Sequence, residues 1–146
     1  DATIYESDGT WFLFFGEDST ALTVLNLWFA DSPFDIFLPH PENPVVISPY
    51  TARMGGAVLR SNGRMMRFGQ DNSAEYGEAL SILEITKLSR TEYSETYVGR
   101  ITVDDFKGPH SLSINLNSSE ILFDYYSNEF SLMAGVRRLK GRIGSR

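Results

Sequence analysis

The chain has 146 residues, enough for one domain, and its 42% hydrophobic and 13% aromatic content is sufficient to bury a substantial core. Its formal net charge of −6 disfavours nucleic acid or an anionic membrane as the main partner, and no apolar run is long enough to span a bilayer. The absence of cysteine excludes disulfides and thiolate chemistry.

The first predicted element is a β-hairpin formed by residues 2–6 and 10–16. Its Asp8-Gly9 turn favours type I′ geometry, because both central residues of that turn need positive φ. The second strand is apolar on both faces, which predicts a strand inside a sheet. A polar loop then leads to a third strand, Leu22–Ala30, which is rich in β-branched and aromatic residues.

The next segment, 33–44, contains four prolines and is typical of a loop or an edge excursion. A second unit follows, with strands predicted near 56–60, 64–70 and 78–88. Residues 91–101 are predicted as a fourth strand at the outer edge of this unit.

The two hairpins repeat one pattern of strand, tight Gly turn, aromatic-rich strand and polar end, in residues 1–18 and 55–71. The second copy turns at Asn62-Gly63, another strong type I′ signal. Two matching hairpins with similar loops predict blades of a β-propeller, whose chemistry gathers at blade ends around a central axis.

A final hairpin is predicted over His110–Leu116 and Glu120–Tyr126, with its turn at Asn117-Ser118. The tail, Phe130–Ile143, has helical spacing, but its Gly and β-branched Val leave an edge strand open. Long helical patterns are otherwise missing, so the predicted fold class is all-β. Because the chain begins with Asp rather than Met, we expect a processed product or a piece of a longer protein.

Several stretches together resemble one known superfamily. Segment 27–46, LWFADSPFDIFLPHPENPVV, is similar to a connection in five-bladed propellers related to glycoside hydrolase family 43, with Asp35-Ile36-Phe37 where the family usually has Gly-Pro-Trp. Segment 52–95 more closely resembles the domain N-terminal to the transferase module of glucosamine inositolphosphorylceramide transferases and related bacterial proteins. The matching marks are Arg53 to Gly56, Arg67 to Asp71, Tyr76-Gly77 and Thr91 to Tyr93; segments 108–114 and 123–143 look like the closing part of the bacterial members.

The resemblance implies a five-bladed propeller, of which this chain supplies about two and a half to three blades. The blade units would be about 1–50, 51–105 and 106–146, and we expect the C-terminal half of a propeller whose remaining blades are a partner. The compartment stays open: the Golgi lumen for a eukaryotic glycolipid glycosyltransferase, the cytoplasm for a bacterial protein.

The resemblance also suggests a catalytic position, Asp1. In glycosidase relatives the matching Asp faces the central cavity, orients the general acid and tunes its pKa, in a reaction that needs two carboxyl groups about 5–9.5 Å apart. The alternative is a frayed terminal residue.

Hydrolase relatives carry their Glu general acid near Gly55-Gly56, where this chain has none, which counts against ordinary hydrolysis. Arg53 beside it can bind a phosphate or carboxylate as a fork, or only pack a loop.

The cluster from Arg67 to Asp71 is the best binding candidate. Strand alternation places Arg67, Gly69 and Asp71 on one face and Phe68 and Gln70 on the other. A bend at the strand end would bring both Gln70 and Asp71 to the cavity, where planar polar groups match vicinal sugar hydroxyls. The alternative is a buried Arg67–Asp71 pair that ties adjacent blades together.

Two further candidates flank the cluster. Tyr76 is either a stacking face for a sugar or an ordinary core residue. His110 matches a position that is often a cavity-facing histidine in relatives, where it binds sugar hydroxyls or a central ion, but a lone histidine is equally a structural residue. With only two distant histidines, His40 being expected at the surface or in packing, we predict no metal and no cofactor. The aromatic set that includes Trp11 and Trp28 is expected in the core between blades rather than as a sugar platform.

Three functions remain open. The first is a carbohydrate- or glycolipid-recognising domain associated with a glycosyltransferase or other glycan-processing enzyme. The second is a glycoside hydrolase whose other carboxylates lie in missing N-terminal blades, and the third is a non-catalytic interaction scaffold. The missing Glu at Gly55-Gly56 favours the first over the second, and the polar strand ends favour both over the third.

Overall fold

The computed structural model describes residues 1–115 and 120–127. Its regular elements are β-strands paired in antiparallel sheets, which confirms the predicted all-β class. The predicted turn at Asn117-Ser118 and the two alternatives for the tail, Phe130–Ile143, lie outside the described residues. Within the described ranges, no helix combines the length and the apolar character that crossing a membrane requires.

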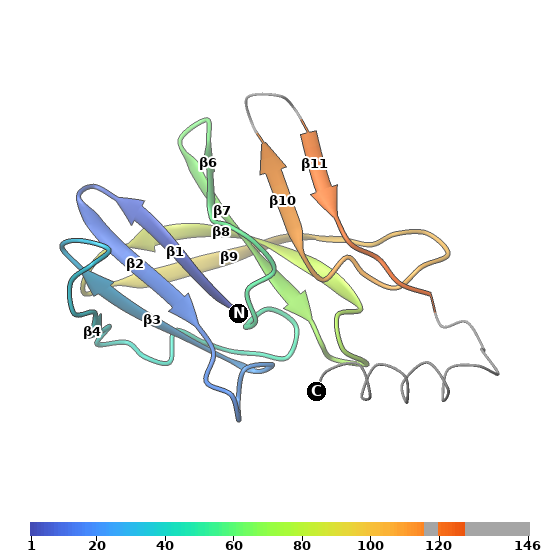
Figure 1. Ribbon diagram of the computed structural model, residues 1–146, viewed down its shortest axis with the longest axis horizontal. Helices are drawn as coiled ribbons and strands as arrows, with labels where there is room; N and C mark the ends of the chain where they lie inside the picture. Colours follow the sequence, from blue (N-terminus) through green and yellow to red (C-terminus); the bar gives the residue numbers. More distant parts are fainter. Residues whose placement is uncertain (116–119, 128–146) are drawn as a thin grey trace, which may run out of the picture.

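The first sheet contains the predicted hairpin and third strand (Figure 1). Asp8 and Gly9 have φ of 51° and 76°, so the turn has the two positive values that its sequence predicted. β2 lies inside the sheet between β1 and β3, also as predicted. The strands are β1 (Ala2–Ser7), β2 (Thr10–Phe15), β3 (Val24–Ala30), β4 (Leu38–Pro39) and β5 (Val46–Ile47).

The proline-rich connection follows the outer edge of β3, with which the short strands β4 and β5 both pair. Between them, the Asn43 side chain donates to the carbonyl of Leu27 at 2.7 Å and accepts from its N–H at 2.8 Å. The Asn43 side chain thus satisfies the Leu27 backbone groups that a neighbouring strand would otherwise pair. The proline-rich segment pairs less well there, because proline has no N–H to donate. His40 is buried and its Nδ1 accepts from the Glu42 N–H, so Nε2 carries the proton that is donated to the Ser89 carbonyl. His40 is therefore a packing residue, one of its two predicted roles.

The second sheet is a four-stranded antiparallel meander. Asn62 and Gly63, with φ of 50° and 78°, form its first turn as predicted, and β9 is the outer strand. Its first strand starts later than residue 56, because the Gly55 carbonyl accepts from Leu112 instead of joining the sheet. The strands are β6 (Leu59–Ser61), β7 (Arg64–Asp71), β8 (Ala79–Leu88) and β9 (Tyr93–Ile101).

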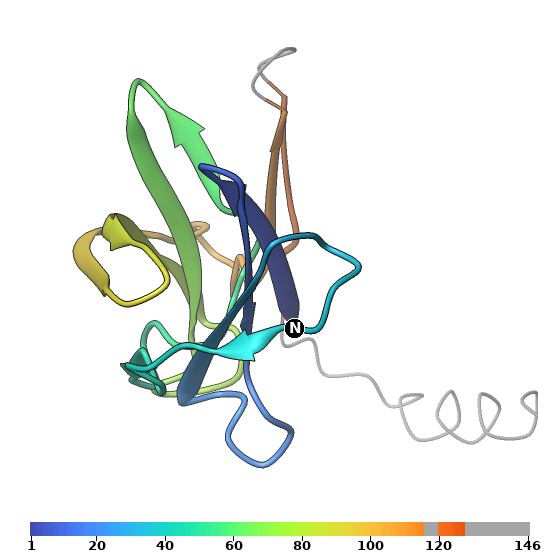
Figure 2. The same ribbon diagram turned by 90° about the vertical axis from the view of Figure 1, so that its left-hand side faces the viewer.

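A separate hairpin, β10 (Leu112–Asn115) with β11 (Glu120–Phe123), completes the described strands. Figure 2 shows that this hairpin and the β6–β7 hairpin rise on the same side of the molecule and diverge toward their tips. β10 is attached to the rest of the protein through a parallel bridge between Gly56 and Leu112. The start of the hairpin therefore lies beside the segment that precedes β6.

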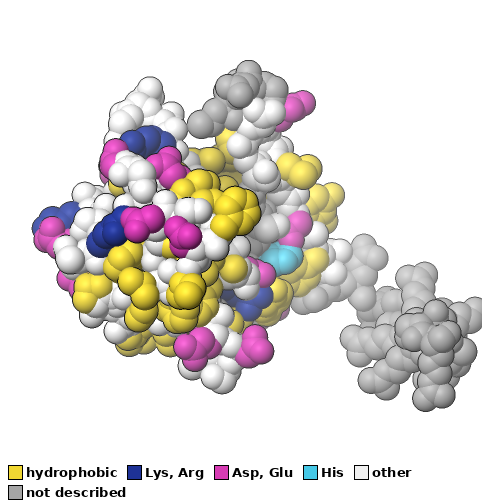
Figure 3. Space-filling model, turned by 60° about the vertical axis from the view of Figure 1, so that its left-hand side comes forward, with side chains coloured by type: hydrophobic (Ala, Val, Ile, Leu, Met, Phe, Trp, Pro, Cys, Tyr) yellow, Lys and Arg dark blue, Asp and Glu magenta, His cyan; other side chains and the backbone are white. Residues whose placement is uncertain are grey.

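The main core lies between the first and second sheets. Phe12 and Phe14 are almost fully buried there, as predicted for the aromatic set, and Phe14 meets Tyr93 of β9 edge-on. The opposite face of the first sheet is more open: Trp28, which was expected in the core, is 36% exposed, and Ile4 is 47% exposed, because no described element covers this face. Figure 3 shows hydrophobic side chains gathered on the molecular face over this sheet. The aromatic residues thus divide between a core and an exposed apolar surface.

Candidate functional site

A polar cavity of about 500 Å³ lies where four segments meet. The start of β1 contributes Asp1, the end of β7 contributes Gln70, and the loops that follow β7 and β9 contribute Tyr76 and His110. Residues 2–4, residues 54–57 and Ser111 complete the lining. Four of the predicted site residues therefore line one cavity although they are far apart in the sequence.

The segment 53–56 brings these side chains together by running alongside β7. Gln70 N–H donates to the Arg53 carbonyl at 2.7 Å, and Gly55 N–H donates to the Phe68 carbonyl at 2.8 Å. On its other side, the Gly56 carbonyl accepts from Thr3 Oγ1 of β1 at 3.2 Å. The segment thus bridges the two sheets and fixes the distance between Asp1 and Gln70.

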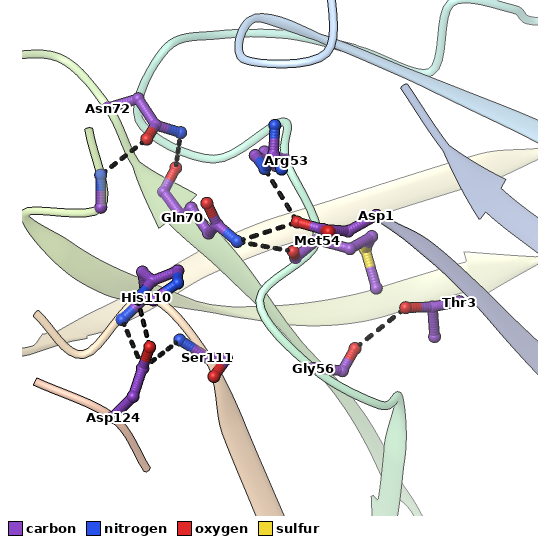
Figure 4. A network of polar contacts seen from close by, with 11 residues as sticks. Asp1, Thr3, Arg53, Met54, Gly56, Gln70, Asn72, His110, Ser111 and Asp124 are labelled. Carbon is purple, nitrogen blue, oxygen red and sulfur yellow. Dashed lines mark hydrogen bonds and ion pairs between the residues drawn. The ribbon is translucent and has the colours of Figure 1, made fainter. Parts of the chain in front are cut away.

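Gln70 is the most constrained polar group in the cavity, at only 2% exposed. Its Nε2 donates to Asp1 Oδ2 at 3.2 Å and to the Met54 carbonyl at 3.1 Å (Figure 4). These two acceptors fix the amide orientation, because the reversed amide would point its oxygen at both of them. The Gln70 Oε1 atom is buried and has no hydrogen-bond partner among the described residues.

Arg53 joins the cavity through Asp1. Its Nε donates to Asp1 Oδ2 at 2.8 Å, and its guanidinium lies 5.6 Å from the centre of the Tyr76 ring. The side chain of Asp1 is 51% exposed, whereas that of Arg53 is only 18% exposed. The guanidinium therefore balances the charge of the carboxylate, which stays half exposed. A cation–π contact with Tyr76 helps to hold the Arg53 side chain in place.

His110 is held from two sides. Asp124 Oδ1 accepts from the backbone N–H groups of His110 and Ser111 at 3.1 and 2.8 Å, and the carboxylate also faces Nδ1 of the imidazole. Gly77 packs against the other side: it has φ of +63°, and a Cβ there would lie 2.6 Å from the His110 Cβ. The ring is 5.6 Å from that of Tyr76. Asp124 was not predicted, because only the folded chain shows which of the acidic residues reaches the histidine.

The structure does not bring Arg67 to this cavity, contrary to the expectation of one shared pocket. Arg67 is fully buried between the sheets, where its Nε and Nη2 donate to Glu95 at 2.5 and 2.6 Å and its Nη1 donates to the Thr51 carbonyl at 2.7 Å. The Tyr93 hydroxyl accepts from Nε at 3.2 Å and donates to Glu95 at 2.5 Å. Arg67 therefore forms a buried ion pair, as in the alternative prediction, but with Glu95 rather than Asp71, and the pair links β7 to β9 within the second sheet rather than tying two sheets together.

Electrostatics keep this buried network in one protonation state. Burial by itself would lower the pKa of Arg67, but Tyr93 and Glu95 outweigh it and the pKa is raised. Burial raises the pKa of Tyr93 well above its ordinary value of 10.0. Arg67 is therefore charged and Tyr93 neutral at physiological pH.

Asp71 also lies outside the cavity. The register pairs Arg67, Gly69 and Asp71 with inward residues of β8, which confirms the predicted alternation and places Gln70 on the opposite face. The expected bend that would turn Asp71 toward Gln70 is absent. Asp71 Oδ1 instead accepts from the Ser73 N–H and hydroxyl at 3.0 and 2.6 Å, and Oδ2 pairs with Arg100 at 2.9 Å.

The cavity lining combines a carboxylate oxygen, an amide oxygen and an imidazole with one exposed aromatic ring. Chemically, these groups offer hydrogen-bond acceptors, an imidazole that can donate or accept, and an apolar face. In the described part of the chain, no three His, Asp or Glu side chains converge as a metal site would require.

The family model described as "Glucosamine inositolphosphorylceramide transferase 1, N-terminal" matches residues 1–115. The chain belongs to this family. The segment matched by the glucosamine inositolphosphorylceramide transferase N-terminal family contains Asp1, Arg53, Gln70, Tyr76 and His110, whereas Asp124 lies beyond it.

Relatives in plants carry the same name. The chain is 33% identical over 105 residues to glucosamine inositolphosphorylceramide transferase 1 of Oryza sativa subsp. japonica, and 32% identical over 105 residues to that of Arabidopsis thaliana. Each match covers 67% of this chain and 14% of the relative, so the chain spans a small part of the length of these proteins. No solved structure matches the chain.

Proposed function

We propose that this domain recognises a carbohydrate, or the saccharide part of a glycolipid, on behalf of a glycosyltransferase, and that the cavity between Asp1, Gln70 and His110 is the binding site. The relatives are named as transferases, and their names connect this family with a glycolipid acceptor. Recognition would position the saccharide and leave the transfer chemistry to another module.

The buried Oε1 atom of Gln70 carries the proposal. Leaving such an acceptor without a partner costs about 1–3 kcal/mol, so it is normally satisfied. Because Nε2 is already used by Asp1 and Met54, the amide cannot rotate to repair this. A sugar hydroxyl in the cavity can donate to Oε1 and, as both donor and acceptor, can bridge to a neighbouring polar group.

The other residues complete a saccharide site. Tyr76 is 50% exposed, so its ring offers an apolar face to the C–H side of a sugar. The Oδ1 atom of Asp1 accepts a hydrogen bond from a sugar hydroxyl, while Arg53 and Gln70 hold Oδ2 in place. His110, oriented by Asp124, presents the other ring nitrogen to the ligand.

Binding is better supported than hydrolysis. Among the described residues lining the cavity, Asp1 is the only carboxylate, and glycoside hydrolysis by the usual route needs two. One oxygen of Asp1 is also taken by both Arg53 and Gln70. We therefore assign Asp1 to binding; loss of a measured hydrolysis activity on Asp1→Asn would restore the catalytic role.

We also propose that the sheets are blades of a larger propeller. The β6–β9 meander has the four antiparallel strands of a blade, and the exposed face with Ile4 and Trp28 is the surface on which a preceding blade would pack. Arg67 and Glu95 then link β7 to β9 inside one blade rather than contacting the ligand.

A glycan array followed by calorimetry tests the proposal. We expect Gln70→Ala and Tyr76→Ala each to weaken binding of the saccharide that the array selects. Tyr125→Ala is the matched control, because Tyr125 is similarly exposed, at 56%, and lies outside the cavity lining. An array with no bound glycan, or binding unchanged in both cavity variants, would leave the scaffold function as the better explanation.

A further inference from the structure

A second cavity, of about 560 Å³ and with a mixed polar and apolar lining, lies on the other face of β7 from the first. Gln70 and Asp71 are neighbours in the strand, yet they line different cavities because their side chains alternate. The two cavities share no lining residue. A ligand in one therefore makes its contacts independently of the other.

A β-bulge shapes this second cavity. Tyr97 and Arg100 are three residues apart and would point to opposite faces of a regular strand. The register shifts between Ile82 and Leu83, so Tyr97 pairs with Leu83 while Arg100 pairs with Ser81. Since Leu83 and Ser81 share a face, the bulge brings Tyr97 and Arg100 to the same side, the re-aiming of a side chain that bulges commonly provide beside functional sites.

Two exposed aromatic rings border the cavity. Tyr97 is 57% exposed and Tyr50 is 56% exposed, and they come from separate parts of the chain. Ser81, at the base, donates its hydroxyl hydrogen to the Tyr50 carbonyl at 2.9 Å, which fixes the backbone that carries that ring. Aromatic faces kept in solvent beside polar groups are suited to a ligand with both apolar and hydroxyl surfaces.

The polar groups between the rings are already in place. The Arg100 Nη2 atom lies 2.9 Å from Asp71 and 3.5 Å from Glu78. Asp71 is only 4% exposed and is held by Ser73, so it anchors the guanidinium. Arg100 remains 39% exposed. A ligand therefore meets a planar donor whose position costs little entropy to fix on binding.

We propose that this cavity is a second saccharide-binding site, in which a neutral sugar stacks on Tyr97 or Tyr50, accepts a hydrogen bond from Arg100 and donates one to Glu78. The site contains two carboxylates and one guanidinium, an excess of negative charge that disfavours uronic acids and phosphorylated sugars. Its volume is in the range of small-molecule sites. With two sites, the domain would hold an extended glycan or two separate chains.

The test uses the Gln70→Ala protein, which lacks the key group of the first cavity. Saturation-transfer NMR titrations with mannobiose, galactobiose and cellobiose are compared with digalacturonate. We expect at least one neutral disaccharide to bind and digalacturonate to bind more weakly. Tyr97→Ala should weaken binding about tenfold, or about 1.4 kcal/mol, while Tyr97→Phe, which keeps the ring, should change it little.

Two further variants make the result decisive. Arg100→Lys keeps the charge but loses the planar fork and should weaken binding, whereas Tyr125→Ala should not. The proposal is overturned if none of the neutral disaccharides binds, if digalacturonate binds best, or if Tyr97→Ala and Tyr125→Ala have equal effects. Because the first cavity is already disabled, such a failure leaves the proposed function of that cavity untouched. If instead the proposed function of the first cavity is wrong, saccharide binding will be the same in the unmodified protein and in Gln70→Ala.

Discussion

Gln70 donates a hydrogen bond to the carboxylate of Asp1 at 3.2 Å, although the two residues are 69 positions apart in the chain. The bond joins the end of β7 to the start of β1, and both residues line the polar cavity. Segment 53–56 makes this possible by pairing with β7 on one side and contacting Thr3 on the other. The cavity is thus a product of how the two sheets meet.

The buried pair of Arg67 and Glu95 should be essential to the second sheet, because it links β7 to β9 across β8. Arg67→Met leaves Glu95 without its partner in a largely buried site, which we expect to cost about 3–5 kcal/mol in the free energy of unfolding. Urea denaturation measures the change. Arg64→Met is the control, because Arg64 pairs with Glu84 at the exposed end of the same strand and should have a much smaller effect. Equal losses in both variants would contradict the assigned role of Arg67.

Gly69 should be intolerant of any side chain. A Cβ at this position would lie 2.2 Å from the Thr51 carbonyl oxygen, so Gly69→Ala must displace the backbone that crosses β7. We expect a loss of about 1–3 kcal/mol, the usual cost of overpacking. Gly99 in the same sheet has no atom within 4 Å of such a Cβ, and Gly99→Ala should be tolerated. Thermal melts of the two variants distinguish the cases, and similar melting temperatures would be the contrary result.

Tyr93 should make stability depend on alkaline pH. Burial raises its pKa in the folded state, whereas the unfolded phenol ionises near its ordinary value of 10.0. Above that value the unfolded chain loses a proton that the folded chain keeps, so the free energy of unfolding falls as pH rises; below it, this contribution is fully present. Urea denaturation between about pH 8 and pH 11 should show a shallower fall for Tyr93→Phe. An identical slope in both proteins would refute the assignment.

Local signals in the sequence were sufficient for most of the fold. The Asp8-Gly9 and Asn62-Gly63 turns fixed both hairpins, because their requirement for positive φ is met by few residue pairs. The alternation of Arg67 and Gln70 along β7 was also predictable from strand geometry. The short strand β5 was not predicted, since its pairing with β3 depends on the course of a connection between them.

Long-range partners were not predictable in the same way. Glu95 rather than Asp71 pairs with Arg67, and Arg100 rather than Arg67 pairs with Asp71. These choices follow from the register of β8 and β9, including a bulge beside Gly99, and a glycine in a strand interior indicates a bulge without showing which side chains then meet. Strand alternation predicted which side chains share a face of the sheet. Their ion-pair partners depend on the neighbouring strands, whose register is not visible in the sequence.

The most direct measurement of the central claim is a titration of the isotopically labelled protein with the glycan that the array selects, followed by two-dimensional NMR. The account predicts that the side-chain amide of Gln70 and the backbone amides of Gly55, Gly56 and Ser111 shift together and saturate with one dissociation constant, because all four line the cavity. Saturable binding that leaves these four signals in place would contradict the assignment of the cavity between Asp1, Gln70 and His110 as the saccharide site.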